Sequence, residues 1–350
     1  MGCLFFKLPL KNNLGGYMQN ILITGGAGFI GTNVTAEMLQ RGHNVVVVDD
    51  FKNAYASNIN RLKKQFKNLQ VFKANCCNQQ AMEDIIKNYK FDTIIHLAAK
   101  KYVFESFAHP KAYMHNNMNS LAVVLSLATK YNINKVAFAS TIAVYGEAHT
   151  KNVAENQAYA PTSPYAKTKQ LGEEMIIDWQ ASNQQKTAII FRFTNPTSAN
   201  TKYMIGNNPK MKRLTLVPLV VECALSGKNL KLNGNDHPTV DGTPVRDFIH
   251  IEDLSQIVCD VVEQCNNPGT EILNVGRGDN GYSVLQVVNA VEKAVGKPIN
   301  YSFGPKVEGD IAYIVCDNHK LKQNYGEHKF ANIEQMVKQE LIYRNHLNNK

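Results

Sequence analysis

The sequence predicts an α/β protein with a doubly wound parallel sheet and a smaller mixed α/β lobe. A short apolar strand at residues 20–24 runs into a glycine-rich loop at residues 25–31, and a helical pattern follows the loop. A second apolar strand, residues 45–48, ends in two adjacent aspartates. Strand and helix patterns then alternate as far as residue 193, which is typical of a Rossmann-type sheet with helices on both faces.

The composition is that of an ordinary globular protein. Hydrophobic residues make up 44% of the 350 residues and charged residues 19%. The 38 Lys and Arg against 29 Asp and Glu give a net charge of +9, which fits an anionic small-molecule substrate. The basic residues are scattered, so no nucleic-acid partner is predicted. No apolar run approaches the roughly 18–20 residues that a membrane span needs, so no membrane partner is expected.

The seven cysteines indicate free thiols. Their number is odd, and no C-x-x-C pair occurs in the sequence. We therefore expect neither a disulfide framework nor a metal site, and we expect the reducing environment of the cytoplasm.

The glycine-rich loop fits the binding of a dinucleotide cofactor. Gly25 allows the tight turn after the strand, Gly28 lets backbone N–H groups approach a pyrophosphate, and Gly31 lets the helix pack close to the strand. The helix N-terminus favours the negative charge of the pyrophosphate. Asp49, at the end of the next strand, can accept hydrogen bonds from a ribose diol and would repel a 2′-phosphate, which favours NAD over NADP.

Apolar runs mark the remaining strands of the predicted sheet. They are rich in Val, Ile, Phe and Ala, as expected for parallel strands covered on both faces. Helical patterns between them imply crossovers between parallel strands. The later strands are expected at residues 71–74, 93–99, 136–141 and 187–193, and helices at residues 79–89 and 112–131.

After Asn195-Pro196 the regular alternation ends. Residues 197–213 are polar and loop-like, which indicates a change of architecture. The later elements are expected as strands near 231–234 and 245–250, and as helices at 219–226, 251–265, 283–295 and 333–346.

These patterns divide the chain into three parts. Residues 18–193 are predicted to form the NAD-binding Rossmann domain, and residues 194–350 mainly the substrate-binding lobe. Segments near 246–277 are expected to return to the first domain. Residues 1–17 are expected to be a disordered extension, because Met18 directly precedes the first strand.

Two residues four positions apart are the main candidates for catalysis. Pro164 can start a helix, on which Tyr165 and Lys169 share one face. A lysine held near a tyrosine hydroxyl favours the phenolate, so Tyr165 can act as a base below its usual pKa of about 10. Thr141 falls at the carboxyl end of a strand, where ligands bind in open α/β sheets, while His96 is expected to be a packed core histidine. Alone, the Tyr and Lys spacing is also typical of an exposed helix face.

Several motifs together resemble the extended short-chain dehydrogenase/reductase family, and within it the UDP-glucose 4-epimerases. The resemblance runs from Met18 to about Asp317. Single motifs are common, but their combination is specific to enzymes that act on sugar nucleotides. The matching segments are residues 24–31, 96–106, 116–117, 141 with 144–146, 165 with 169, 195–196, 234–236 with 241–243, 246–250, 274–278 and 308–310.

The resemblance implies a redox-neutral epimerisation with NAD retained in the site. Tyr165, acidified by Lys169 and by the nicotinamide charge, would take the proton from the sugar 4-hydroxyl. Thr141 would hydrogen-bond the same oxygen. The C4 hydride would go to NAD⁺ and return to the other face of the 4-ketose.

The resemblance also implies which residues hold the two ligands, and it implies a homodimer that pairs through long helices such as residues 112–131. Besides the three loop glycines, the cofactor-binding residues are Phe29, Ile30, Asp49, Asp50, Asn75, Cys76, Leu97, Ala98, Ala99, Lys101, Asn116, Tyr165, Lys169 and Phe193. The UDP-sugar would be held by Thr141, Tyr165, Asn195, Arg246 and Asp310.

Five positions depart from the pattern of these epimerases. Asn75 replaces the acidic residue that binds the adenine amino group in these epimerases, and Thr141 replaces their catalytic serine. Thr215 stands where these epimerases have an asparagine in the uridine site, and Asn233 stands where they have an aromatic residue before Gly-Asn-Asp. Val307 replaces an arginine that binds phosphate. Loss of that arginine costs about 1.5–3 kcal/mol of binding if nothing replaces it. The catalytic residues are therefore present, whereas binding of the UDP diphosphate is expected to be weaker.

Other functions stay open at this point. Ile314 lies near the position that controls bulk at the sugar 2-substituent, and its middling size fits both plain and N-acetylated UDP-hexoses. A UDP-glucuronate epimerase would need only a few further polar contacts. A 4,6-dehydratase would need an acid after Thr141, where this chain has Ile142 and Ala143. A diverged NAD-binding protein without activity fits the departures but not the intact catalytic residues.

Overall fold

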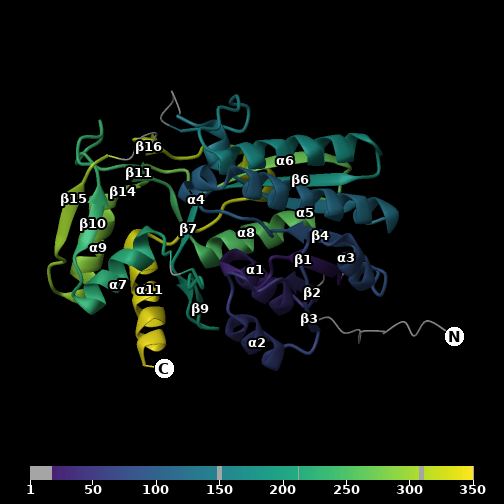
Figure 1. The fold of residues 1–350 in the computed structure, drawn as a ribbon, viewed down its shortest axis with the longest axis horizontal. Helices are drawn as coiled ribbons and strands as arrows, with labels where there is room; N and C mark the ends of the chain where they lie inside the picture. The colour runs from purple at the N-terminus through teal and green to yellow at the C-terminus, as the bar shows by residue number, and fades with distance from the viewer. Residues whose placement is uncertain (1–17, 148–151, 212, 307–310, 350) are drawn as a thin grey trace.

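The computed structural model describes residues 18–147, 152–211, 213–306 and 311–349. Within them, a seven-stranded sheet in which every neighbouring pair is parallel forms the centre of the protein, which confirms the predicted fold class (Figure 1). The spatial order is β13 (Gly269–Val275), β6 (Thr187–Phe193), β5 (Lys135–Thr141), β4 (Thr93–His96), β1 (Asn20–Thr24), β2 (Asn44–Asp49) and β3 (Leu69–Lys73).

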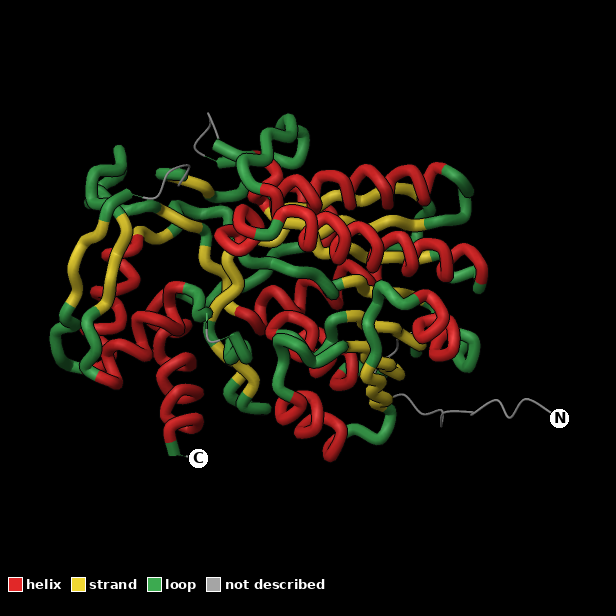
Figure 2. Tube along the Cα trace, in the orientation of Figure 1, coloured by secondary structure: helices red, strands yellow, loops and turns green. Residues whose placement is uncertain are grey.

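Helices connect the strands and also build much of the second lobe, as the red segments of Figure 2 show. They are α1 (Phe29–Gln40), α2 (Ala56–Gln65), α3 (Gln79–Ile86), α4 (Val103–Ala108), α5 (Pro110–Lys130), the 3₁₀ turn η1 (Ile142–Tyr145), α6 (Pro164–Ala181), α7 (Leu216–Ser226), α8 (Ile251–Gln264), α9 (Val284–Val295), α10 (His319–Tyr325) and α11 (Ile333–Asn348). Among the residues described, none of these helices combines the length and the hydropathy that a membrane crossing requires.

Short strands complete the second half of the chain. They are β7 (Asn195–Thr197), β8 (Ala199–Asn200), β9 (Ile205–Gly206), β10 (Leu230–Asn233), β11 (Val245–Arg246), β12 (Phe248–His250), β14 (Tyr282–Ser283), β15 (Tyr301–Gly304) and β16 (Tyr313–Ile314). β10 pairs in parallel with β15, and β7 in parallel with β12.

The central sheet is buried on both faces because its strands are apolar at successive positions. In β1, Ile21 and Ile23 pack into one core that includes residues of α1 and α8. Leu22 points the other way, into a second core with residues of α3, α5 and α6. Each buried side chain of this size contributes about 1.5–3 kcal/mol. Helices therefore cover both faces, as the near-continuous apolar runs predict.

The smaller lobe has a core of its own. Buried residues of α7, α9 and α11 pack together there, among them Val220, Val288 and Met336. Figure 1 shows this lobe beside the central sheet, with β10 and β15 on its outer side. β13 lies elsewhere, at the edge of the central sheet next to β6, although it follows the first short strands in sequence.

Most elements agree with the sequence, and the differences have simple causes. α5 begins at Pro110 rather than at residue 112, since a proline fits the first helical turn. β3 spans residues 69–73 rather than 71–74. Helix α2 was not predicted, because only Ile59 and Leu62 of its ten residues are buried.

The parallel register brings the strand ends to one edge of the sheet. Thr24 of β1 pairs with His96 of β4, and Thr141 of β5 pairs with Phe193 of β6. The loops that follow these strands therefore meet along one line. Ligands of open α/β sheets bind at this edge.

Candidate active site

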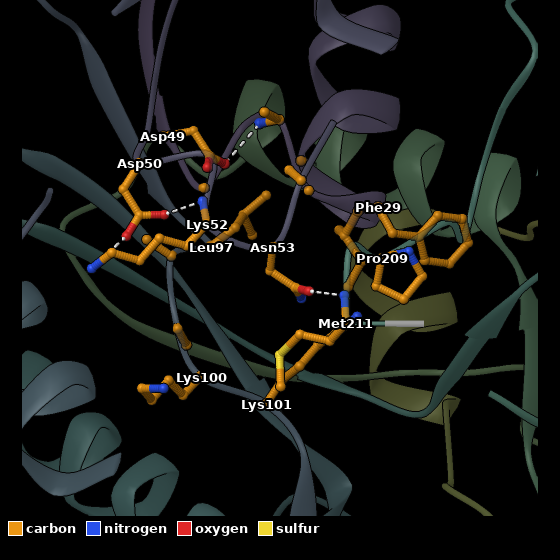
Figure 3. A pocket seen from close by; sticks show the side chains of 18 of the residues that line it. Phe29, Asp49, Asp50, Lys52, Asn53, Leu97, Lys100, Lys101, Pro209 and Met211 are labelled. Atoms are coloured by element: carbon orange, nitrogen blue, oxygen red, sulfur yellow. Dashed lines mark hydrogen bonds and ion pairs between the residues drawn. The ribbon is translucent and has the colours of Figure 1, made fainter. Parts of the chain in front are cut away.

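A cavity of about 320 Å³ lies along the carboxyl ends of β1 to β5 (Figure 3). It contains most of the residues that the sequence assigns to the cofactor. Those that line it are Gly25, Gly28, Phe29, Ile30, Gly31, Asp49, Asp50, Asn75, Cys76, Leu97, Ala98, Ala99, Lys101 and Asn116.

At Gly25 and Gly31 of the glycine loop, backbone atoms leave no room for a side chain. Gly25 has a φ of +69°, and a Cβ there would lie 2.7 Å from the backbone nitrogen of Ala98. A Cβ on Gly31 would lie 2.2 Å from the carbonyl oxygen of Gly25. Gly28 is the N-cap of α1 and has no side chain to satisfy the first N–H groups of that helix. The N-terminus of α1 is therefore available to an anionic group in the cavity.

Asp49 is fixed at the end of β2. Its Oδ2 accepts a hydrogen bond from the Ala27 N–H at 3.1 Å, and its Oδ1 accepts one from the Phe51 N–H at 2.8 Å. Burial raises the pKa of the Asp49 carboxyl, and these two backbone donors oppose that effect. The neighbouring Asp50 is more exposed and lies 3.4 Å from the ammonium of Lys52. Asp49 is thus the carboxylate with a fixed orientation beside the cavity.

A segment of the second half of the chain covers the cavity at the strand ends of the first half. Residues 206–211, the covering segment, begin at the last residue of β9 and contribute Pro209 and Met211 to the lining (Figure 3). The N–H of Lys210 donates to the carbonyl of Asn53 at 3.1 Å, and the N–H of Met211 to its Oδ1 at 3.4 Å. Asn53 Nδ2 also donates to the Tyr102 hydroxyl at 3.3 Å. Asn53 therefore joins the covering segment to the first domain.

Thr141, Tyr165 and Lys169 are not among the residues that line this cavity. They adjoin it through Ala139, which lines the cavity and lies on β5 with Thr141. The side chains of Thr141 and Tyr165 are hydrogen-bonded. The ammonium of Lys169 donates to the carbonyl oxygen of Ala139 at 2.6 Å and lies 4.8 Å from the ring centroid of Phe138. Lys169 is 4% exposed, so the interpretation of this helix face as solvated is wrong for the lysine. The structure brings all three predicted catalytic residues together.

The ionisation of this group differs from the prediction. Burial raises the pKa of Tyr165 to about 12, and the hydrogen bond with Thr141 opposes the shift. Burial lowers the pKa of Lys169 to about 8, and the carboxylate of Glu173 opposes that shift. In the protein chain by itself, burial therefore raises the pKa of Tyr165 and Lys169 does not lower it, so the expected acidification by Lys169 is wrong for this state.

The predicted substrate residues of the second half lie next to each other. The N–H of Asn195 donates to the carbonyl of Asp247 at 2.9 Å, directly after Arg246. The Asp247 carboxylate is buried and accepts N–H groups from Arg277 and Gly278 at 3.0 and 3.2 Å. These bonds fix the backbone that carries Arg246.

The remaining predictions concern Phe193, residues outside the described ranges, and a metal site. Phe193 is buried and stacked on Phe191, with ring centroids 5.7 Å apart, next to Thr141 in the sheet. Asp310 and Val307 lie outside the described residues, as do residues 1–17. In the described part of the chain, no group of three or more His, Cys, Asp or Glu is placed to hold a metal ion.

His96 is a buried core residue, as expected. Its Nδ1 lies 2.8 Å from the Thr24 hydroxyl, and its ring stacks on Phe138. Burial lowers the pKa of His96 to about 3, with a further lowering from Lys169. The imidazole is therefore neutral at physiological pH.

Comparison with known proteins assigns these features to one family. A model of the NAD dependent epimerase/dehydratase family matches residues 21–276. That range contains the glycine loop, Asp49, the catalytic candidates and Arg246.

Individual relatives and a solved structure agree with this match. The UDP-glucose 4-epimerase of Bacillus subtilis (strain 168) is 34% identical over 319 residues, which cover 90% of this chain and 94% of that protein. The UDP-glucose 4-epimerase of Caenorhabditis elegans is 35% identical over 334 residues, which cover 91% and 95%. The crystal structure of UDP-glucose 4-epimerase from Bifidobacterium longum in complex with NAD+ and UDP has a TM-score of 0.90 and 32% identity, and the match covers 94% of this chain and 99% of that one.

Proposed function

This chain belongs to the NAD dependent epimerase/dehydratase family, and from that premise we propose that it interconverts the C4 epimers of a UDP-hexose with NAD as cofactor. The relatives are named UDP-glucose 4-epimerases, so we propose UDP-glucose and its C4 epimer UDP-galactose as the substrate pair. The observation that carries the proposal is the hydrogen-bonded Thr141 and Tyr165, with buried Lys169 on the same helix. Lys169 is bonded to Ala139, which lines the same cavity as the glycine loop.

Tyr165 is the acid and base of the proposed reaction. As a phenolate it would remove the proton of the sugar 4-hydroxyl, and it would return that proton after epimerisation. NAD held by the glycine loop and Asp49 would supply reversible hydride acceptance at C4 and a positive charge that favours the Tyr165 phenolate. Thr141 would donate its hydroxyl to the developing oxyanion, where a fixed donor is worth most.

Lys169 would act in two ways. One of its three N–H donors is committed to the carbonyl of Ala139, which orients the ammonium. Its remaining donors would bind the nicotinamide ribose and stabilise the Tyr165 phenolate through their charge. A lysine with a pKa of about 8 is still mostly protonated at neutral pH, as this role requires.

The remaining predicted residues would hold the two ligands. The N-terminus of α1 would bind the pyrophosphate of NAD, and Asp49 the adenosine ribose. Arg246 and Asn195 would hold the UDP portion, with Arg246 bound to a phosphate. Asp310 is proposed for the same site. Asn53, Tyr102 and the covering segment join these residues as walls of the cofactor cavity.

Dehydration is the less favoured reaction. A nucleotide-sugar 4,6-dehydratase needs an acid to protonate the leaving hydroxyl, and the residues after Thr141 are Ile142 and Ala143. Both side chains are hydrocarbons, so neither can supply that proton.

A direct assay tests the proposed reaction. Purified protein is incubated with UDP-galactose and NAD⁺, and the sugar nucleotides are resolved by chromatography. We expect UDP-glucose to form without net NADH, whereas a 4-keto-6-deoxy product or no conversion of any UDP-sugar would contradict epimerisation. Parallel incubations with UDP-N-acetylgalactosamine and UDP-glucuronate define the sugar class.

We also propose a homodimer in the cytoplasm. α4, α5 and α6 pack against one another, and Phe104 and Phe107 of α4 are 66% and 58% exposed beside α5. Burial of such side chains against a second copy would stabilise a dimer. The cysteines of the described residues are free thiols, which suits a reducing compartment. Light scattering after size-exclusion chromatography tests the dimer, and Phe104→Asp with Phe107→Asp should yield monomers.

A further inference from the structure

A buried ion pair lies on the same helix as the catalytic residues. Glu173 of α6 is fully buried, and Arg192 of β6 is 2% exposed. Nη2 of Arg192 donates to Oε2 of Glu173 at 2.7 Å, and its Nε donates to both carboxylate oxygens at 3.1 Å. Glu173 lies four residues after Lys169 and eight after Tyr165, so the three side chains leave the same face of α6.

Glu173 is also bonded to the strand that carries the other catalytic group. The Ser140 hydroxyl donates to Oε1 of Glu173. Ser140 stands between Ala139, whose carbonyl accepts the Lys169 ammonium, and Thr141, which is hydrogen-bonded to Tyr165. The carboxylate therefore joins α6 to β5 at the residue between these two contacts.

Arg192 holds the carboxylate in one place. Its guanidinium carbon lies 4.9 Å from the ring centroid of Tyr145 and 5.1 Å from that of Tyr159. Nη1 donates to the Tyr145 hydroxyl at 2.7 Å and to the Glu155 carbonyl at 2.9 Å. The Tyr159 hydroxyl donates to Glu173 at 2.8 Å. A buried ion pair is a costly way to stabilise a core, since apolar replacements of similar volume are often as stable. The groups around this pair therefore decide whether it has a role beyond packing.

The charge near Lys169 comes from a small set of groups. On its own helix the ionisable neighbours are Tyr165 and Glu173. From β5 it meets the ring of Phe138 and the carbonyl of Ala139, and from β4 His96, a neutral imidazole, stacks behind that ring. Among the described residues, Glu173 is the acid whose field raises the pKa of Lys169 against the effect of burial.

We propose that Glu173, fixed by Arg192, is a positioning residue that keeps Lys169 protonated and keeps α6 in register with β5. This inference deepens the proposed function, because protonated Lys169 is the form that the reaction needs. The inference can be tested most directly by measuring the pKa of Lys169. That measurement does not depend on which sugar nucleotide the protein binds.

The test measures Lys169 directly. Protein labelled with ¹³C at lysine Cε is titrated from pH 6 to 11 by NMR, and the Lys169 signal is assigned with Lys169→Arg. Glu173→Gln alone leaves Arg192 buried and unpaired and is expected to fold poorly, so the double variant Glu173→Gln with Arg192→Met is the main test. Glu174→Gln is the matched control, because Glu174 is the next residue and is exposed.

We expect the Lys169 midpoint near pH 8 in the native protein and lower in the double variant, by up to about one pH unit, since the Glu173 carboxylate one helical turn away has been removed. The Arg192 charge is removed with it and offsets part of the shift, because the two groups form an ion pair. The alkaline limb of kcat with UDP-galactose should move with it, whereas Glu174→Gln should change neither. Ser140→Ala keeps the charge, so it should lower kcat without moving the midpoint. A folded double variant with an unchanged midpoint would overturn the proposal. If the midpoint moves but no UDP-sugar is converted by the native protein, the proposed function fails and this inference stands.

Discussion

The ammonium nitrogen of Lys169 lies 2.6 Å from the carbonyl oxygen of Ala139, on the strand that ends in Thr141. This bond to a backbone carbonyl orients the ammonium, whereas the Glu173 carboxylate acts on it through its charge. Burial lowers the pKa of Lys169 to about 8, two to three pH units below an exposed lysine. The charge state of the site therefore changes within a pH range in which enzymes are commonly assayed.

The first prediction concerns this pH dependence. The charged form of Lys169 exists below its pKa, so epimerase activity should be maintained up to about pH 8 and fall above it, about tenfold per pH unit. The pH profile of kcat with UDP-galactose measures this limb. Lys169→Met should remove most activity at every pH, whereas Lys167→Met, on the exposed side of α6, should leave the profile unchanged. A flat profile to pH 10 would contradict the assignment.

The second prediction separates the roles of Tyr165 and Thr141. Tyr165→Phe removes the proton acceptor and should lower kcat by at least about 10³-fold. Thr141→Val removes only a donor to the oxyanion and should cost about 10²–10³-fold, and Thr141→Ser should recover most of it. Each variant should still bind NAD, which tryptophan or nucleotide fluorescence can report. Near-native turnover in Tyr165→Phe would exclude Tyr165 as the base.

The third prediction concerns release of the cofactor. Asn53 joins the first domain to the covering segment through Lys210 and Met211. Asn53→Ala removes the side-chain bonds to Met211 and Tyr102 and should speed NAD dissociation about fivefold to tenfold, since each such bond contributes about 0.5–1.5 kcal/mol. Rapid exchange into a fluorescent NAD analogue measures the rate. Asn58→Ala is the matched control, because Asn58 lines the same cavity and bonds Arg61 of its own helix. Equal NAD dissociation rates in the two variants would contradict the role of Asn53 in holding the covering segment over the cavity.

Features of the site that depend on neighbouring residues could be predicted from the sequence. The glycine loop needs no partner beyond the strand before it and the helix after it, so Gly25, Gly28 and Gly31 lie where expected. The same holds for Asp49, because the end of an apolar strand is visible in the sequence. Parallel order then brings Thr141 to the same edge of the sheet.

Features that depend on distant segments could not be predicted in this way. Asn53 and Met211 are more than 150 positions apart, and residues 206–211 carry no periodic pattern. Glu173 is one of several acids on a helix, and its partner Arg192 is identified only once β6 is placed beside β5. The pKa of Tyr165 likewise depends on burial by the whole fold.

The fourth prediction concerns stability in acid. Burial lowers the pKa of His96 to about 3, below the value of about 6.5 in an unfolded chain. Between these values the unfolded state binds a proton that the folded state does not, so stability should fall as the pH drops below about 6.5. Thermal unfolding from pH 7.5 to 5.0 should show a smaller decline in His96→Gln than in the native protein. His109→Gln removes an exposed histidine and should leave the decline unchanged.

The fifth prediction concerns the choice between NAD and NADP. Both oxygens of Asp49 are held by backbone N–H groups, of Ala27 and Phe51, so the carboxylate cannot turn away from a 2′-phosphate. Asp49→Asn keeps an acceptor for the ribose but removes the charge, and it should narrow the ratio of NAD⁺ to NADP⁺ affinity by at least about tenfold, or about 1.4 kcal/mol. Isothermal titration of cofactor-free protein with each dinucleotide measures the two Kd values. Asp50→Asn is the control, since Asp50 is more exposed and lies beside Lys52. If Asp50→Asn changes the ratio and Asp49→Asn does not, the ribose is recognised by the second aspartate of this strand end.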